Sequence, residues 1–142
     1  TLSQNTIFPI TDKRSISMIS HVNLGTNDLA RAEGFYNELV KFFGGAQLFK
    51  SDRMAFYSLG EGSAKIAINT PFDGQPANAG NGSMVALSAA SKEQVDAVHA
   101  MALELGGSCE GAPGARMDGA FYGAYFRDLD GNKFGVFNMG NK

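Results

Sequence analysis

The chain has 142 residues, with 14 Asp and Glu against 12 Lys and Arg, and a formal net charge of −2. Apolar residues make up 44% of it, enough for the core of one compact domain. The scattered Lys and Arg residues give no reason to expect a nucleic-acid partner. No apolar run approaches the roughly 20 residues that cross a bilayer, so we expect no membrane span. One cysteine permits no internal disulfide and favours a reducing compartment, so we expect a cytoplasmic protein.

A polar segment opens the chain. We expect residues 1–17 to be an N-terminal extension and residues 18–142 to form a single domain. Alternation predicts a first strand within residues 16–24, because side chains of a strand point to its two faces in turn. The apolar face of this strand carries Ile16, Met18, Val22 and Leu24. The opposite face carries Ile19, His21 and Asn23.

The first predicted helix begins after Asp28, whose carboxylate can accept from the free amide groups of the first turn. Apolar residues recur at helical spacing from there to the Gly-Gly pair at residues 44–45, which predicts the end of the helix. A strand follows at residues 65–69. Residues 71–82 contain two of the four prolines and are predicted to be a linker.

The second half of the chain repeats this order. A strand is predicted at residues 83–89, and Ser91 begins a capping box for a second helix that ends at residues 106–107. The glycine-rich residues 111–119 are predicted to be a loop. The segment from Asp128 to Asn132, Asp-Leu-Asp-Gly-Asn, lacks the spacing of an EF-hand calcium loop and is predicted to be a tight hairpin turn.

An internal repeat organises these elements. Residues 20–26 match residues 83–89 at an offset of 63, and residues 65–68 match residues 133–136 at an offset of 68. Each copy consists of a strand, a helix and three strands. The predicted fold is therefore α+β, with two βαβββ modules at about 18–70 and 82–139.

Two segments resemble the vicinal oxygen chelate superfamily, which includes glyoxalases, bleomycin-resistance proteins and ring-cleaving dioxygenases. Its opening strand and helix are similar to residues 19–36, Ile-Ser-His-Val-Asn-Leu-Gly-Thr-Asn-Asp-Leu-Ala-Arg-Ala-Glu-Gly-Phe-Tyr. Its closing hairpin is similar to residues 126–133, Phe-Arg-Asp-Leu-Asp-Gly-Asn-Lys. The resemblance spans residues 20–138. It implies paired modules that form an open, cup-shaped sheet, commonly in a homodimer.

Enzymes of this superfamily hold a divalent metal with four side chains, two from each module. The matching positions in this sequence are His21, Ala67, Met84 and Gly135. Ala and Gly supply no donor atom, and a Met thioether suits copper better than Zn, Ni, Mn or Fe(II). Since a catalytic site needs about three donors, we expect no metal and no cofactor.

The candidate ligand site lies on the strand faces opposite the helices. Because these faces tolerate polar residues and would border an enclosed space, they are expected to bind a small molecule. The candidate binding residues are His21, Asn23, Asn69, Met84, Arg116, Tyr125 and Phe137. Arg116 and Tyr125 are expected at the rim, where they could orient an anionic or aromatic ligand. Three further residues could do the same, namely Arg53, Tyr57 and Tyr122.

His99 and Cys109 are predicted to have structural rather than catalytic roles. His99 is predicted to lie on the surface of the second helix, because nothing near it repeats a ligand spacing. Cys109 has no histidine near it in the sequence and is predicted to be a small hydrophobic residue rather than a nucleophile.

Two functions remain open at the level of the sequence. The first is a metal-free protein that binds a small, partly apolar compound. The second is a lyase or isomerase that either uses His21 as its base, without metal, or has a non-standard metal site. In both cases the expected partners are a small molecule and a second copy of the chain.

Overall fold

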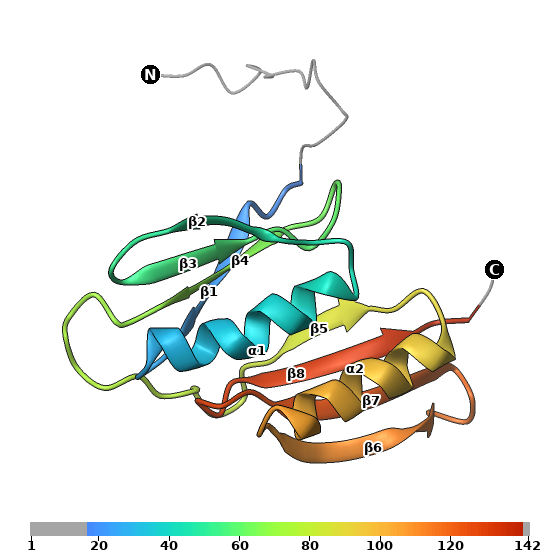
Figure 1. Cartoon of the computed structure of the whole chain (residues 1–142). Helices are drawn as coiled ribbons and strands as arrows, with labels where there is room; N and C mark the ends of the chain where they lie inside the picture. The colour runs from blue at the N-terminus through green and yellow to red at the C-terminus, as the bar shows by residue number, and fades with distance from the viewer. Residues whose placement is uncertain (1–16, 141–142) are drawn as a thin grey trace, which may run out of the picture.

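The computed structural model describes residues 17–140, so nearly all of the predicted extension lies outside the described residues. Two βαβββ modules follow each other along the chain (Figure 1). The first comprises β1 (His21–Gly25), α1 (Leu29–Lys41), β2 (Gln47–Lys50), β3 (Met54–Tyr57) and β4 (Lys65–Asn69). The second comprises β5 (Val85–Ser88), α2 (Lys92–Glu104), β6 (Ser108–Arg116), β7 (Phe121–Arg127) and β8 (Lys133–Asn138).

The strands form two four-stranded sheets of the same topology, with the orders β1-β4-β3-β2 and β5-β8-β7-β6. The first strand of each module is parallel to its last strand, and the other pairs are antiparallel. This confirms the predicted α+β fold of two βαβββ modules. The sheets remain open, without closure into a barrel.

Both helices begin at the predicted caps. The carboxylate of Asp28 accepts from the amide of Arg31 at 3.1 Å, and the Ser91 hydroxyl accepts from the amide of Gln94 at the same distance. Gly106, just beyond α2, has a φ of +100°, a conformation that favours glycine and stops the helix. No helix within residues 17–140 is long and apolar enough to cross a membrane.

Two predicted boundaries are wrong. The first strand begins at His21 rather than near residue 16, and the side chain of Met18 is fully exposed. Its partner β4 begins at Lys65, whose amide donates to the carbonyl of Ser20, so no neighbouring strand extends further. The predicted loop at residues 111–119 is also partly strand, because β6 runs to Arg116. Register shifts at Cys109/Gly111 and Gly111/Gly114 absorb its glycines.

Helix α1 lies between the two sheets and joins their cores. The ring of Phe35 lies 6.3 Å from that of Phe126 in the second sheet, between centroids. Tyr36 lies 6.1 Å from Phe134 in the second sheet and 6.2 Å from Tyr57 in the first. The helix-facing sides of both sheets therefore share one hydrophobic core. We call the opposite sides the outer faces of the two sheets.

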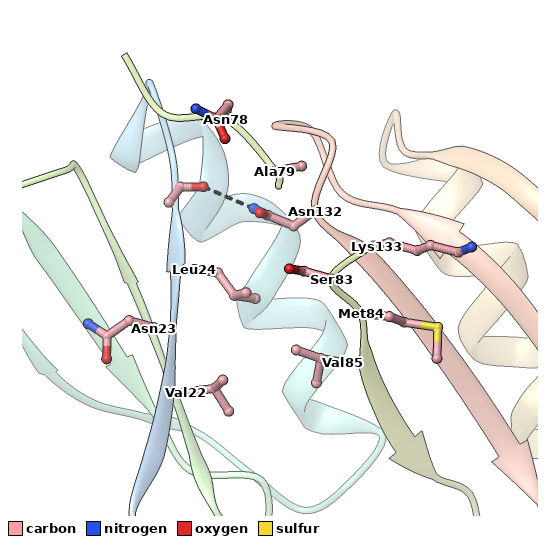
Figure 2. A pocket seen from close by; sticks show the side chains of 11 residues that line it. Val22, Asn23, Leu24, Asn78, Ala79, Ser83, Met84, Val85, Asn132 and Lys133 are labelled. Carbon is pink, nitrogen blue, oxygen red and sulfur yellow. Dashed lines mark hydrogen bonds between the residues drawn. The ribbon is translucent and has the colours of Figure 1, made fainter. Parts of the chain in front are cut away.

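The β7–β8 turn, residues 128–132, connects the modules by polar contacts and is called the turn cluster below. Asp128 is buried and accepts from the Tyr36 hydroxyl at 2.5 Å and from the Asn132 amide side chain at 2.9 Å. Asn132 also donates to the carbonyl of Gly25 at 2.9 Å (Figure 2). The predicted hairpin turn is confirmed, and its side chains hold the end of β1 against the second module.

Candidate functional site

Three aromatic rings form a platform on the outer face of the second sheet. The Phe137 ring meets the rings of Phe121 and Tyr125 edge to face, with centroids 5.2 and 5.4 Å apart. All three side chains are half-buried. Their order on the sheet follows from pairing of β7 with β8, which places Phe137 opposite Gly123 and Tyr125 opposite Gly135. We call Phe121, Tyr125 and Phe137 the aromatic platform.

Glycines beneath the platform make room for the Phe137 ring. A Cβ atom at Gly135 would lie 2.5 Å from Cζ of Phe137, and one at Gly123 would lie 2.5 Å from its Cδ1. Neither distance is compatible with a side chain, so the ring occupies the space that two side chains would otherwise fill. The two glycines therefore allow Phe137 to lie close to the backbone of the sheet.

Two cations flank the platform at Tyr125. The Arg116 guanidinium carbon lies 5.8 Å from the Tyr125 ring centroid, and the Lys133 Nζ lies 5.5 Å from it. Arg116 also donates to the carbonyl of Ala112 at 2.6 Å, and a Cβ at Gly114 would lie 2.9 Å from its Nη1. Among residues 17–140, neither cation forms an ion pair with a carboxylate. Neither positive charge is therefore taken up by a salt bridge within this part of the chain.

Two clefts lie near the platform and share Ser83, Met84 and Lys133 in their linings. The seam cleft, of about 290 Å³, lies between β1 and β5 and is shown in Figure 2. The platform cleft, of about 440 Å³, is lined by Tyr125, Lys133, Arg127 and the linker residues 81–83 together with Met84. Both volumes are of the order that small-molecule sites require.

The outer face of the first sheet carries the other predicted site residues. His21 is exposed, its Nδ1 lies 3.1 Å from the Ser20 hydroxyl, and its ring meets Phe56 edge to face at 5.2 Å. The Asn23 amide donates to Asn69 Oδ1 at 2.9 Å. Figure 2 shows Asn23 and Met84 pointing away from each other, whereas Val22 and Val85 point into the seam.

The structure thus divides the predicted site residues into two groups. One group, on the outer face of the second sheet, contains Met84, Arg116, Tyr125 and Phe137. The other, on the first sheet, contains His21, Asn23 and Asn69. Within residues 17–140, no hydrogen bond, ion pair or aromatic contact joins the two groups. The sequence interpretation missed Lys133, although its alternation with Gly135 and Phe137 places it on the same face.

The family model described as the Glyoxalase/Bleomycin resistance protein/Dioxygenase superfamily matches residues 18–136. The chain belongs to this superfamily. A glyoxalase/bleomycin resistance protein from Albidiferax ferrireducens is 41% identical, with a TM-score of 0.79 over 87% of this chain and all of its own. No curated protein sequence matches the chain.

More distant solved structures share the superfamily fold. A lactoylglutathione lyase from Agrobacterium tumefaciens is 24% identical, with a TM-score of 0.63 over 87% of this chain and 94% of its own. A fosfomycin resistance protein from Listeria monocytogenes is 23% identical, with a TM-score of 0.64 over 89% of this chain and 95% of its own. These two similarities concern the fold alone.

The four positions that the resemblance predicts for a divalent metal, His21, Ala67, Met84 and Gly135, do not fit a metal here. Ala67 and Gly135 carry no donor atom, and the Phe137 ring fills the space above Gly135. Met84 offers only a thioether, which leaves His21 as the one nitrogen donor. Within residues 17–140, no group of three His, Cys, Asp or Glu side chains is arranged to hold a metal ion.

The packing of α2 on β6 corrects the prediction for His99. His99 is buried rather than on the helix surface, and its Nε2 lies 3.3 Å from Sγ of Cys109. Cys109 is exposed, and the histidine that it contacts is not near it in the sequence. The two residues are ten positions apart, and they meet because α2 packs on β6 and β7. No spacing in the sequence indicates this contact.

The three additional candidates for orienting a ligand lie elsewhere. Tyr57 is completely buried in the core, where burial raises the pKa of its hydroxyl. Tyr122 is on the helix-facing side of the second sheet, and its hydroxyl donates to Asp96 at 2.6 Å. Arg53 lies over the exposed ring of Phe72, 5.4 Å from its centroid. None of the three contacts the aromatic platform.

Proposed function

We propose that this protein is a metal-free binding protein whose ligand is a small, planar anion. The observation that carries the proposal is a pair of half-buried cations, Arg116 and Lys133, that lie against the Tyr125 ring beside a cleft of about 440 Å³. An aromatic or conjugated ring would contact Met84 and the edge of the platform. Its acidic group would take the charge-assisted hydrogen bonds that neither cation makes with a carboxylate of the described residues.

Binding is better supported than catalysis by the surroundings of His21. A general base is usually oriented by a second group, often a carboxylate. The contacts of His21 among the described residues are the Ser20 hydroxyl and the Phe56 ring, and neither is ionised. The neighbouring structures include both a lyase and a resistance protein, so membership of the superfamily does not choose between the two functions. Turnover of a carbonyl compound or an epoxide, lost in His21→Ala, would contradict the binding proposal.

The anion requirement is tested with two fluorescent probes of nearly the same shape. Anilinonaphthalene sulfonate carries a negative charge, and phenylnaphthylamine has the same rings without it. We expect the sulfonate to bind more tightly, and Lys133→Gln to weaken its binding about tenfold, the effect of losing about 1.4 kcal/mol. The affinity for the neutral probe should change little in the same variant.

Lys92 provides a matched control on the other side of the same sheet. Its Nζ lies 5.7 Å from the centroid of the Tyr122 ring, nearly the geometry of Lys133 on Tyr125. Lys92→Gln removes the same charge without touching the platform and should leave sulfonate binding unchanged. Equal effects of the two variants, or equal binding of the two probes, would contradict the proposed site.

A further inference from the structure

Cys109 and His99 form a contact pair on the helix-facing side of the second sheet, away from the aromatic platform. Their Sγ and Nε2 atoms are 3.3 Å apart. Cys109 lies on the edge strand β6 and is exposed, whereas His99 on α2 is only 7% exposed. The thiol is therefore open to reagents in solvent, while packing holds the imidazole beside it.

The surroundings favour the neutral form of the His99 imidazole, the form that has a lone pair free for the thiol proton. Burial lowers the pKa of His99, and the nearby charge of Asp96 opposes this only in part. The Asp96 carboxylate itself accepts from the Tyr122 hydroxyl. Near pH 7 the ring is therefore uncharged, and with its proton on Nδ1 the Nε2 atom accepts from the thiol. Glu110, adjacent to the cysteine, is paired with Arg127, so its negative charge is compensated.

We propose that Cys109 is a reactive thiol and a site of reversible modification by small disulfides, with His99 as its proton acceptor. The thiol proton passes to Nε2 while Sγ attacks one sulfur of the disulfide. A new S–S bond joins Cys109 to one half of the reagent, and the old S–S bond breaks. The other half leaves as a thiolate and takes the proton from the imidazolium, so no further oxidant or reductant is required.

This inference does not depend on the proposed ligand site. The register of β6 with β7 places Cys109 opposite Phe126, whose side chain is in the core, whereas Tyr125 and the platform are on the outer face. Modification at Cys109 would add a group at the edge of α2 and leave the platform cleft unfilled. The two proposals are therefore tested by separate variants.

The experiment uses the fact that Cys109 is the one cysteine of the chain, so any thiol adduct reports on it. The protein is mixed with oxidised glutathione at pH 7, and formation of the mixed disulfide is followed by mass spectrometry. Alkylation by iodoacetamide, an uncharged reagent, is measured in parallel. The variants are His99→Gln, Cys109→Ser and, as an exposed control near the end of the same helix, Glu104→Gln.

The native thiol should react faster than the same thiol in protein unfolded by urea. His99→Gln should slow both reactions about tenfold, because a positioned proton acceptor contributes about 10²–10⁴-fold in active sites and an exposed thiol gains less. Glu104→Gln should match the wild type, and Cys109→Ser should form no adduct. Thermal melts establish that each variant is folded. Equal rates for wild type and a folded His99→Gln, or for native and unfolded protein, would overturn the proposal.

Discussion

At Gly135 and Gly123 the outer face of the second sheet has no side chains, and the Phe137 ring lies in the space above them. Both residues are buried, and neither has a positive φ, so their backbone conformation is open to other residues. What requires glycine there is the close approach of the ring. The space above Gly135, one of the four positions that the resemblance predicts for a metal ligand, is thus filled by the Phe137 ring of the aromatic platform.

Gly135→Ala should therefore displace Phe137 and disturb the platform. The new Cβ would lie 2.5 Å from Cζ of Phe137, and overpacking of this kind costs about 1–3 kcal/mol of stability. We expect lower stability in urea unfolding and weaker binding of anilinonaphthalene sulfonate. The matched control is Gly34→Ala, an exposed position in α1 with no atom within 4 Å of the new Cβ. Gly34→Ala should stabilise the protein by about 0.5–1 kcal/mol and leave sulfonate binding unchanged. Weaker binding in Gly34→Ala together with unchanged binding in Gly135→Ala would contradict the role of Gly135 in the platform.

Alternation along single strands predicted which face of the sheet several of these residues occupy, and contacts between elements did not follow from it. Met84, Tyr125 and Phe137 are on the outer face of the second sheet, where period-two alternation placed Met84 and Phe137. The contact of Cys109 with His99 depends on the angle at which α2 crosses β6. That angle is set by packing of the core, which no local pattern records.

Among the connecting elements, the turn cluster carries the largest share of polar contacts between the modules. Besides the bonds of Asp128, its Asp130 carboxylate accepts from the hydroxyl of Thr26 at 2.6 Å and from the amide of Asn27 at 3.0 Å. Arg31, in the first turn of α1, pairs with the same carboxylate at 3.0 Å. The turn thus links the loop between β1 and α1 to the β7–β8 hairpin.

Tyr36→Phe tests this link with almost no change in side-chain volume. The variant loses the hydrogen bond from the Tyr36 hydroxyl to Oδ2 of Asp128. The remaining side-chain donor to that oxygen is then the Asn132 amide. The expected loss of stability is about 1–3 kcal/mol, the cost of an incompletely satisfied buried polar group. Urea unfolding at pH 8 measures it. A change below about 0.5 kcal/mol would show that the bond contributes little.

The same variant makes a prediction at high pH. Burial, reinforced by the charge of Asp128, raises the pKa of Tyr36 well above its ordinary value. Above pH of about 10 the unfolded chain therefore loses a proton that the folded chain retains. The free energy of unfolding should then fall by about 1.4 kcal/mol per pH unit for this group. Tyr36→Phe should show a smaller fall between pH 8 and pH 11, and an equal fall would contradict this role of Tyr36.

The helix boundaries could be predicted from the sequence, whereas the start of β1 could not, because only the helix boundaries depend on neighbouring residues. The caps Asp28 and Ser91 and the stop at Gly106 act through neighbouring residues, so the local sequence indicates them. A strand ends where its partner ends. The start of β1 at His21 is set by the start of β4, more than 40 residues away. The alternation of apolar and polar residues continues before His21, where β1 has no neighbouring strand to pair with.

At the scale of the whole molecule, the two outer faces expose large apolar side chains. Helix α1 lies between the two sheets (Figure 1), and the helix-facing sides of both sheets share one core. Side chains of the two outer faces point away from the seam, as Asn23 and Met84 do in Figure 2. Large apolar side chains are exposed on both modules, with Phe49 53% and Met84 44% accessible. We therefore expect two chains to associate, with the first sheet of one chain placed over the aromatic platform of its partner. Sedimentation showing only monomer at micromolar concentration would contradict this.

Mixing two variants shows whether His21 and Arg116 serve the same site across such a dimer. His21→Ala alters only the first sheet, and Arg116→Gln alters only the second. If each site takes His21 from one chain and Arg116 from its partner, each variant alone should bind anilinonaphthalene sulfonate weakly. When the two are unfolded together and refolded as an equal mixture, about half of the dimers contain one chain of each kind. In a mixed dimer one site receives both substitutions, and the other receives neither. About one quarter of the wild-type binding capacity should then return, with wild-type affinity. If each chain instead formed its complete site on its own second sheet, His21→Ala alone would bind the sulfonate as tightly as the wild type does.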